Sequence, residues 1–333
     1  MLLAVMRRDA EASGLTAISI EAPENRSLPA VLAPALRTAL LRLDRVKNAG
    51  DKVRRALSAL AGFVKLKASY GDLVLAIEHE SEPGLADSGD LEADLTDLIN
   101  SLGEAAAERG TAAVLFIDEL QYIPEEQLAA LIVALHAANQ NQLPVTLVGA
   151  GLPQLLGRMG RAKSYAERLF AFESIGALDL AATEIALRHP IEAEGERIDQ
   201  AAIAAIFEAT EGYAYFLQEW GKQCWEVADA SPINAGDAAT AQASVLAQLD
   251  QSFFRVRLDR LTPSEKRYVS AMALLGPGPQ RSGDIANKLG QPVTAVAPVR
   301  SSLIAKGMVY SPAHGDTAFT VPMFDAYIRR IVI

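Results

Sequence analysis

Cysteine is almost absent from this chain, because Cys224 is the only one among its 333 residues. A single thiol excludes a disulfide framework and a multi-cysteine metal cluster, and it is typical of proteins from a reducing compartment. The sequence also lacks an apolar run of the roughly 18 residues that span a bilayer, and its first six residues are too short for a secretory signal. These absences predict a cytoplasmic protein without a membrane partner.

Disorder is excluded by the composition, since 50% of the residues are hydrophobic and 22% are charged. At about 150 residues per domain, a chain of 333 residues is expected to form two or three domains. The histidines lack metal-ligand spacing, and neither a Ser/His/Asp nor a Cys/His arrangement can be defended from the sequence. The sequence therefore does not point to a metal centre built on histidine or to a nucleophilic triad.

The charge of the chain is divided unevenly. Residues 262–333 carry eight Lys and Arg against four acids, a net +4, so the overall −10 leaves −14 for residues 1–261. Residues 68–108 contain eleven acids and neither Lys nor Arg. This asymmetry indicates that different regions face different partners, although ordinary solvated helix faces explain the acidic run equally well.

The spacing of apolar and turn residues predicts the elements of the first half of the chain. They are, in order, a helix over 2–13 that Gly14 ends, a strand over 16–20, a helix over 30–60, a β-hairpin of 63–67 and 73–77, and a helix over 91–109. Two unbroken apolar runs follow, at 112–117 and 144–149, with a helix between them. Strand, helix and strand in this order predict a right-handed βαβ unit in a parallel sheet. Residues 180–252 are helical in pattern.

Two acids, Asp118 and Glu119, come directly after the first of these apolar runs. Ligands of doubly wound sheets bind at the carboxyl ends of the strands. An apolar strand followed by Asp-Glu is the pattern of a Walker B strand, in which the first carboxylate holds Mg²⁺ and the second polarises the attacking water. The alternative is that both acids only favour the N-terminus of the next helix through its dipole.

Four stretches of the sequence resemble the AAA+-type ATPases of the archaeal-ATPase class, which are related to replication initiators and signal-transduction NTPases. They are residues 114–121, 143–153, 166–170 and 210–218. The resemblance implies a P-loop NTPase-type α/β fold with a parallel sheet over 1–179, an α-helical lid over 180–258 and a winged helix-turn-helix over 259–333. It also implies ATP and Mg²⁺ as cofactors.

The resemblance assigns roles to particular residues of the nucleotide site. Asp118 holds the metal, Glu119 acts as the base, and Arg168 compensates charge in phosphoryl transfer. For Arg168, an ordinary surface ion pair with an acid such as Glu167 remains an equal alternative. Tyr213 stands at the start of a lid helix, where it approaches the adenine or packs within the lid.

The phosphate-binding motif G-x-x-x-x-G-K-[ST] does not occur in the sequence. The nearest match, residues 157–164, has Ala162 in place of the second glycine and follows the Asp-Glu strand instead of preceding it. We interpret this match as accidental. In the family the missing loop and its strand precede the helix and strand predicted at 2–20. We therefore expect a nucleotide domain truncated before Met1, either because the reading frame was started late or because the chain is a natural remnant.

The last region begins with Thr262, which is expected to cap a helix together with Glu265. Two more short helices and an extended pair around His314 complete a winged-helix pattern, in which residues 292–306 form the recognition helix. Lys288, Arg300 and Lys306 are the candidate contacts to DNA phosphates. Winged helices also bind proteins, so a protein partner is the alternative.

Two functions of different class follow from these patterns. The first is a nucleotide-controlled ATPase switch that engages DNA or a protein partner, alone or as a homo-oligomer. The second is a catalytically inert adaptor or DNA-binding protein that keeps the scaffold. The missing phosphate loop favours the adaptor, whereas the Asp118–Glu119 pair favours the ATPase.

Overall fold

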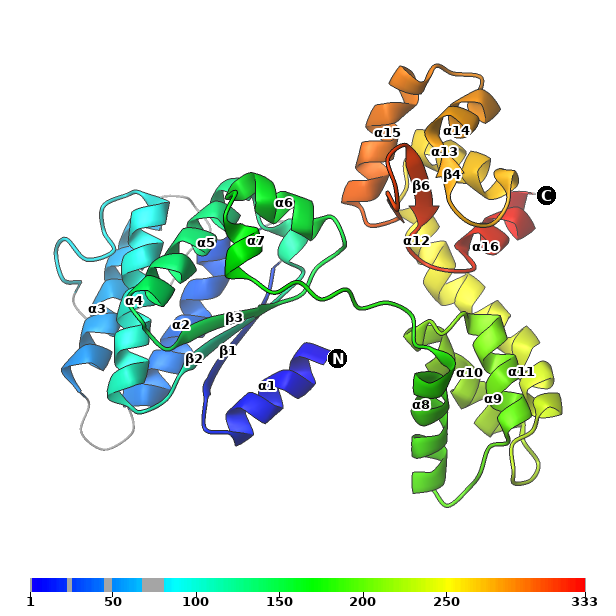
Figure 1. Ribbon diagram of the computed structural model, residues 1–333, viewed down its shortest axis with the longest axis horizontal. Helices are drawn as coiled ribbons and strands as arrows, with labels where there is room; N and C mark the ends of the chain where they lie inside the picture. Colours follow the sequence, from blue (N-terminus) through cyan, green and yellow to red (C-terminus); the bar gives the residue numbers. More distant parts are fainter. Residues whose placement is uncertain (1, 23–25, 45–49, 68–80, 333) are drawn as a thin grey trace. The chain divides into compact units, whose positions relative to one another are not determined.

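The computed structural model describes residues 2–22, 26–44, 50–67 and 81–332 of the chain, which divides into two compact units, Met1–Glu173 and Ser174–Ile333 (Figure 1). Each unit has a hydrophobic core of its own. Within the described residues, no helix combines the length and hydrophobicity that a membrane span requires. The boundaries expected at residues 179 and 258 remain predictions, and both fall inside the second unit, the first of them near its start.

The first unit is built on a parallel sheet. Its strands are β1 (Thr16–Glu21), β2 (Ala113–Asp118) and β3 (Val145–Gly149), in the order β1-β2-β3. β2 is central and buried along Ala113 to Ile117, as the continuous apolar run predicts. The helix between β2 and β3, α5 (Glu125–Gln140), completes the expected βαβ unit. β3 pairs with no second strand among the described residues.

Helices cover the two faces of this sheet unequally (Figure 1). One face packs against α2 (Leu28–Asp44), α4 (Leu91–Glu108) and α5, while α3 (Asp51–Lys67) packs on α2 and α4. The apolar residues of these four helices contribute to the core of the unit. The other face meets α1 (Leu2–Ala12), which contains no buried residue and leaves the Leu2 side chain 56% exposed. The unit ends with α6 (Leu155–Ala162) and α7 (Ala166–Leu169).

The structure confirms the helix and strand at the start of the chain and the helix near 91–109, but it corrects the reading of residues 30–67. The single helix expected over 30–60 is two helices, α2 and α3. The hairpin strand expected at 63–67 is wrong, because these residues are the last turns of α3. The apolar residues of α3 continue at helical spacing through Leu60 to Phe63 and Val64, all buried, so the helical period prevails over the short alternation. The partner strand expected at 73–77 lies outside the described residues.

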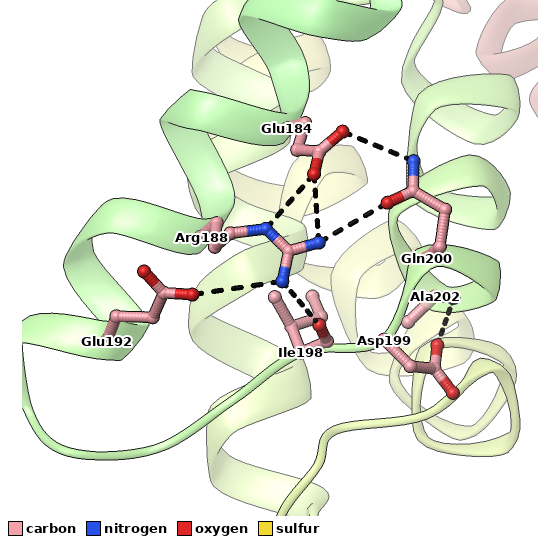
Figure 2. A network of polar contacts seen from close by, with 7 residues as sticks. All are labelled: Glu184, Arg188, Glu192, Ile198, Asp199, Gln200 and Ala202. Atoms are coloured by element: carbon pink, nitrogen blue, oxygen red, sulfur yellow. Dashed lines mark hydrogen bonds and ion pairs between the residues drawn. The ribbon is translucent and has the colours of Figure 1, made fainter.

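The second unit is mainly helical. Its first part comprises α8 (Leu180–Ala193), α9 (Gln200–Thr210), α10 (Ala214–Val227), α11 (Ala235–Gln248), the π-helix η3 (Leu249–Phe254) and α12 (Arg255–Asp259). Arg188 of α8 joins this helix to the start of α9 (Figure 2). Its guanidinium donates to Glu184, to the Ile198 carbonyl oxygen at 3.1 Å and to Gln200 at 3.3 Å. The predicted helical pattern of this region is confirmed.

The last part of the second unit combines helices with a small antiparallel sheet of strand order β4-β6-β5. Its elements are α13 (Pro263–Leu275), β4 (Gln280–Arg281), α14 (Ser282–Leu289), α15 (Val293–Ala305), β5 (Val309–Tyr310), β6 (Asp316–Phe319) and α16 (Phe324–Val332). The capping box of Thr262 and Glu265 is confirmed at the start of α13. The sequence pattern did not predict α16, which buries Phe324, Tyr327 and Ile328 in the core of the unit.

Candidate nucleotide site

The acidic pair lies at the carboxyl end of the central strand β2. Asp118 is the last residue of β2 and is exposed, while Glu119 follows it and is half-buried. The Asp118 Oδ1 atom accepts a hydrogen bond of 2.9 Å from the Glu119 N–H. Glu119 has a φ of 57°, in the left-handed region that residues other than glycine seldom occupy. A strained backbone of this kind persists where the surrounding structure determines it, and such positions cluster at functional sites.

Gln121 holds the carboxylate of this strained residue. Its side chain is buried, with 4% exposure, and its Nε2 donates a short hydrogen bond to the Glu119 Oε2 atom. The Gln121 Oε1 atom accepts from the Leu152 N–H at 3.1 Å. One amide therefore connects the end of β2 with the loop that follows β3, and it leaves the Glu119 Oε1 atom without a partner among the described residues.

Backbone hydrogen bonds lock the same two loops together. The Ala150 N–H donates to Ile117 O at 2.9 Å, and the Leu120 N–H donates to Ala150 O at 3.0 Å. Glycines on both sides of Ala150 allow this close approach: a Cβ at Gly149 would lie 2.3 Å from Leu120 Cδ1 and one at Gly151 would lie 2.8 Å from Gln121 Oε1, so either side chain would have to shift. Ala150 and Gly151, which follow β3, carry no polar side chain, and the Gln121 amide lies beside this loop instead.

Arg158 of α6 secures the acidic loop from the other side. Its guanidinium donates to the carbonyl oxygens of Gln121 and Ile123, the latter from Nη2 at 2.6 Å. Sequence reasoning missed both Gln121 and Arg158. Gln121 could have been found from its position two residues beyond the acidic pair, but the contact of Arg158 depends on the fold, because it joins residues 35 or more positions apart.

The remaining residues proposed for nucleotide binding, Arg168 and Tyr213, belong to other elements of the chain. Arg168 is exposed on the short helix α7, and its side chain forms no ion pair with Glu167 or with any other residue that the structure describes. Tyr213 caps α10 in the second unit, where its ring lies 4.7 Å from that of Phe216. Lys163, in the segment 157–164 that we interpret as an accidental match to a phosphate loop, forms an ion pair with Glu92, with 2.9 Å between Nζ and Oε2.

The carboxylates of this site are of the chemical type that binds Mg²⁺. Exposed carboxylate oxygens are the ligands that Mg²⁺ takes, commonly one or two of them together with water and phosphate oxygens. Glu21 of β1 stands beside Asp118 in the sheet register, which adds a carboxylate at the same edge. Among the described residues, no group of three or more His, Cys, Asp or Glu side chains is arranged to hold a metal ion.

The cations proposed to contact DNA have different surroundings. Arg300 of α15 donates to Thr317 Oγ1 at 2.7 Å and to Ser311 Oγ and Asp316 O at 2.8 Å. Lys306 donates to the buried Glu265 at 2.7 Å. Lys288 is exposed at the end of α14. Of the three, Arg300 and Lys306 are therefore engaged within the unit, and Lys288 faces solvent.

The interaction of Lys306 with Glu265 strongly affects the acid. Burial alone raises the pKa of Glu265, but hydrogen bonds from Lys306, Ser302 and Thr262 outweigh that effect and lower the pKa to about 2. The carboxylate is 3% exposed and accepts from Ser302 Oγ, Lys306 Nζ and the Thr262 N–H at 2.7 Å each. Glu265 and Lys306 thus connect the end of α15 to the start of α13.

Comparisons with known proteins identify relatives of the fold. A family profile described as a domain of unknown function (DUF8462) matches residues 251–328. No curated protein matches the chain. Among solved structures, the chain is similar to the Walker-type ATPase PABY2304 of Pyrococcus abyssi, with 14% identity, a TM-score of 0.50, and coverage of 97% of this chain and 94% of that one.

Two further solved structures match less well. The Orc1 protein of Aeropyrum pernix in complex with DNA has 14% identity and a TM-score of 0.42, over 98% of this chain and 81% of that one. The RuvB Holliday junction branch migration motor of Thermotoga maritima has 15% identity and a TM-score of 0.38, over 81% and 92%. The similarity to PABY2304 spans nearly the whole of both chains and agrees with the fold expected from the sequence. The chain therefore has the α/β fold of this Walker-type ATPase.

Proposed function

We propose that this chain is an AAA+-type, nucleotide-responsive switch protein whose Mg²⁺·ATP site includes Asp118 and Glu119. The observation that carries the proposal is the geometry of Glu119. It lies at the end of the central parallel strand with a φ of 57°, and the Gln121 amide orients its carboxylate beside the exposed Asp118. An acid that only favoured a helix N-terminus would not require a strained backbone or a buried amide partner.

Each residue has a separate task in this proposal. Asp118 supplies an exposed carboxylate oxygen to Mg²⁺, and the metal, when bound, neutralises charge on the phosphates. Glu119 accepts the proton of the attacking water at Oε1, because Oε2 is occupied by Gln121. Gln121 and Arg158 position the acidic loop, and Arg168 offers an unpaired cation to the developing phosphate charge.

The affinity of this chain for ATP is expected to be low. A phosphate loop wraps the β- and γ-phosphates with backbone N–H groups and a lysine, and the 333 residues lack its motif. Without that cradle, we expect a dissociation constant for Mg²⁺·ATP on the order of 1 mM.

The end of the second unit completes the proposed switch. We propose that α13, α14 and α15 with the β4-β6-β5 sheet form a winged helix-turn-helix, which is supported by three helices in succession and an antiparallel strand pair after the third. Residues 262–333, which contain these elements, carry a net charge of +4 that suits an anionic partner, either DNA or an acidic protein. Orc1 was solved in complex with DNA, and RuvB is a Holliday junction motor.

Titration calorimetry with the full chain tests the nucleotide site. We expect saturable binding of Mg²⁺·ATP that weakens several-fold in Asp118→Asn, because the substitution removes a charged metal ligand. Asp284→Asn, an exposed acid of α14, is the matched control and should leave the affinity unchanged. Glu119→Gln should retain binding and slow phosphate release by about 100-fold where turnover is measurable.

The adaptor remains the second candidate, favoured by the missing phosphate loop. Absence of saturable ATP binding at concentrations of several times 1 mM, or identical affinity in Asp118→Asn, would establish the adaptor in place of the switch. Micromolar binding would instead show that the chain builds a phosphate cradle from other residues, and it would contradict the low affinity expected here.

A further inference from the structure

A hollow of about 390 Å³ lies between α13 and α14 in the second unit. Its lining combines three apolar residues, Ala271, Leu274 and Leu289, with three cations, Lys266, Arg267 and Lys288, and with Ser270. Leu274 is 41% exposed although it is a large aliphatic residue. No acidic residue is among those that line the hollow. Apolar side chains next to cations are complementary to a ligand that is both acidic and apolar.

The cations that line the hollow are available to a partner. Arg267 and Lys288 are exposed, and neither forms an ion pair with a residue that the structure describes. Lys266 approaches only the exposed Asp259, at 3.8 Å between Nζ and Oδ1, and such a surface pair is worth little. In contrast, Arg300 and Lys306 of the same unit are held by internal hydrogen bonds.

The exposed surface of α15 argues against DNA as the occupant. Reading base edges relies mainly on Arg, Lys, Asn and Gln side chains. The exposed residues of this helix are neutral and small or aliphatic, namely Val293, Thr294, Ala295, Ala297, Pro298, Ser301 and Ala305. Only two hydroxyl groups among them can form hydrogen bonds with a base. The chemistry of the unit therefore favours a protein ligand.

We infer that the hollow between α13 and α14 is the docking site for an acidic peptide segment of a partner protein, anchored by one apolar side chain. The anchor lies on Ala271, Leu274 and Leu289, and carboxylates on either side of it meet Arg267 and Lys288. The inference rests on the proposed role of this region in engaging a partner, and it does not depend on the nucleotide site.

Selection from a phage-displayed library of random peptides of about 12 residues, with the full chain as target, tests the inference. We expect enriched peptides to carry several Asp or Glu around one Leu, Ile, Phe or Trp. A fluorescein-labelled copy of the best peptide should bind with a dissociation constant on the order of 10 µM and bind less tightly as salt is raised. Arg267→Glu and Lys288→Glu should each weaken that binding by about tenfold, and Leu274→Asn should weaken it as well.

Arg281→Glu is the matched control, because it reverses an exposed charge in the same region outside the hollow, and it should change the affinity by less than about twofold. The two tryptophans, both in α10, report whether each variant keeps the second unit folded. Enriched peptides without acids, or equal affinity in Lys288→Glu, would overturn the inference. So would a DNA duplex of about 30 base pairs that binds more tightly than the peptide and is lost in Lys288→Glu. Calorimetry with ATP measures none of these outcomes, so failure of the peptide inference can be distinguished from failure of the proposed nucleotide site.

Discussion

The two units of this chain differ in how they hold the charged side chains that the sequence singled out for ligand contacts. In Met1–Glu173, the acidic pair at the end of β2 reaches solvent, and a buried amide and backbone bonds hold it in position. In Ser174–Ile333, two of the three cations predicted to contact DNA, Arg300 and Lys306, are bound by the unit itself. A charged side chain that is bonded within its own unit stabilises that unit, and only a charged side chain that the fold leaves free can recognise a partner.

Glu265→Ala should have the largest effect on the stability of the second unit. The substitution removes a buried carboxylate that accepts from Lys306, Ser302 and the Thr262 N–H. Loss of a buried charged partner and a helix cap should lower the free energy of unfolding of the second unit by about 3 kcal/mol. Urea unfolding followed by tryptophan fluorescence measures this unit alone, since the first unit contains no tryptophan. In Asp284→Ala, an exposed control, a loss above about 0.5 kcal/mol would argue against a specific role for Glu265.

The same carboxylate should make the second unit sensitive to acid. The folded pKa of about 2 lies below the value near 4.5 of a free glutamate, so the contribution is present above about pH 4.5 and is lost as the pH falls toward 2. The difference corresponds to about 3 kcal/mol. Tryptophan-detected urea unfolding at a series of pH values measures it. Glu265→Gln cannot titrate at this position, so an equally steep acid profile in that variant would assign the effect to other groups.

Arg300→Ala and Lys288→Ala compare the stability contributions of an engaged and a free cation of the same unit. Arg300 links α15 to Thr317 and Asp316 of β6, and its loss should cost the second unit about 2 kcal/mol. Lys288→Ala, which removes an exposed cation from the same unit, should cost less than about 0.5 kcal/mol. Thermal unfolding of both variants provides the measurement. Equal losses would mean that exposure does not separate the two roles.

The smallest expected effect is in the first unit. Gln121→Ala leaves the Leu152 N–H without its acceptor and frees Glu119, which should cost about 1 to 1.5 kcal/mol. Hydrogen exchange of amides in β2 and β3 detects the change, because the Gln121 amide joins the loops after both strands. Asp118→Asn, at an exposed side chain, should leave the same amides protected. Unaltered exchange in Gln121→Ala would show that the backbone bonds hold the loops by themselves.

Local patterns predicted much of the fold. The apolar run before Asp118 predicted the buried strand β2, because a strand covered on both faces needs apolar residues at every position. Thr262 and Glu265 predicted the start of α13, because a capping box is formed by residues three positions apart. The assignment failed at Phe63 and Val64, where a short apolar alternation also fitted the last turn of a helix.

Some features of the candidate sites were likewise predictable from local sequence patterns, and others were not. That an acidic pair ends a buried strand and that basic residues are in excess after residue 261 can be predicted from neighbouring residues alone. The folded chain was needed to see that Gln121 and Arg158 hold the acidic loop, that Arg300 and Lys306 are engaged, and that Lys288 and Arg267 line a hollow. Each of these facts depends on contacts between residues distant along the chain, and such contacts arise only when helices and strands pack together.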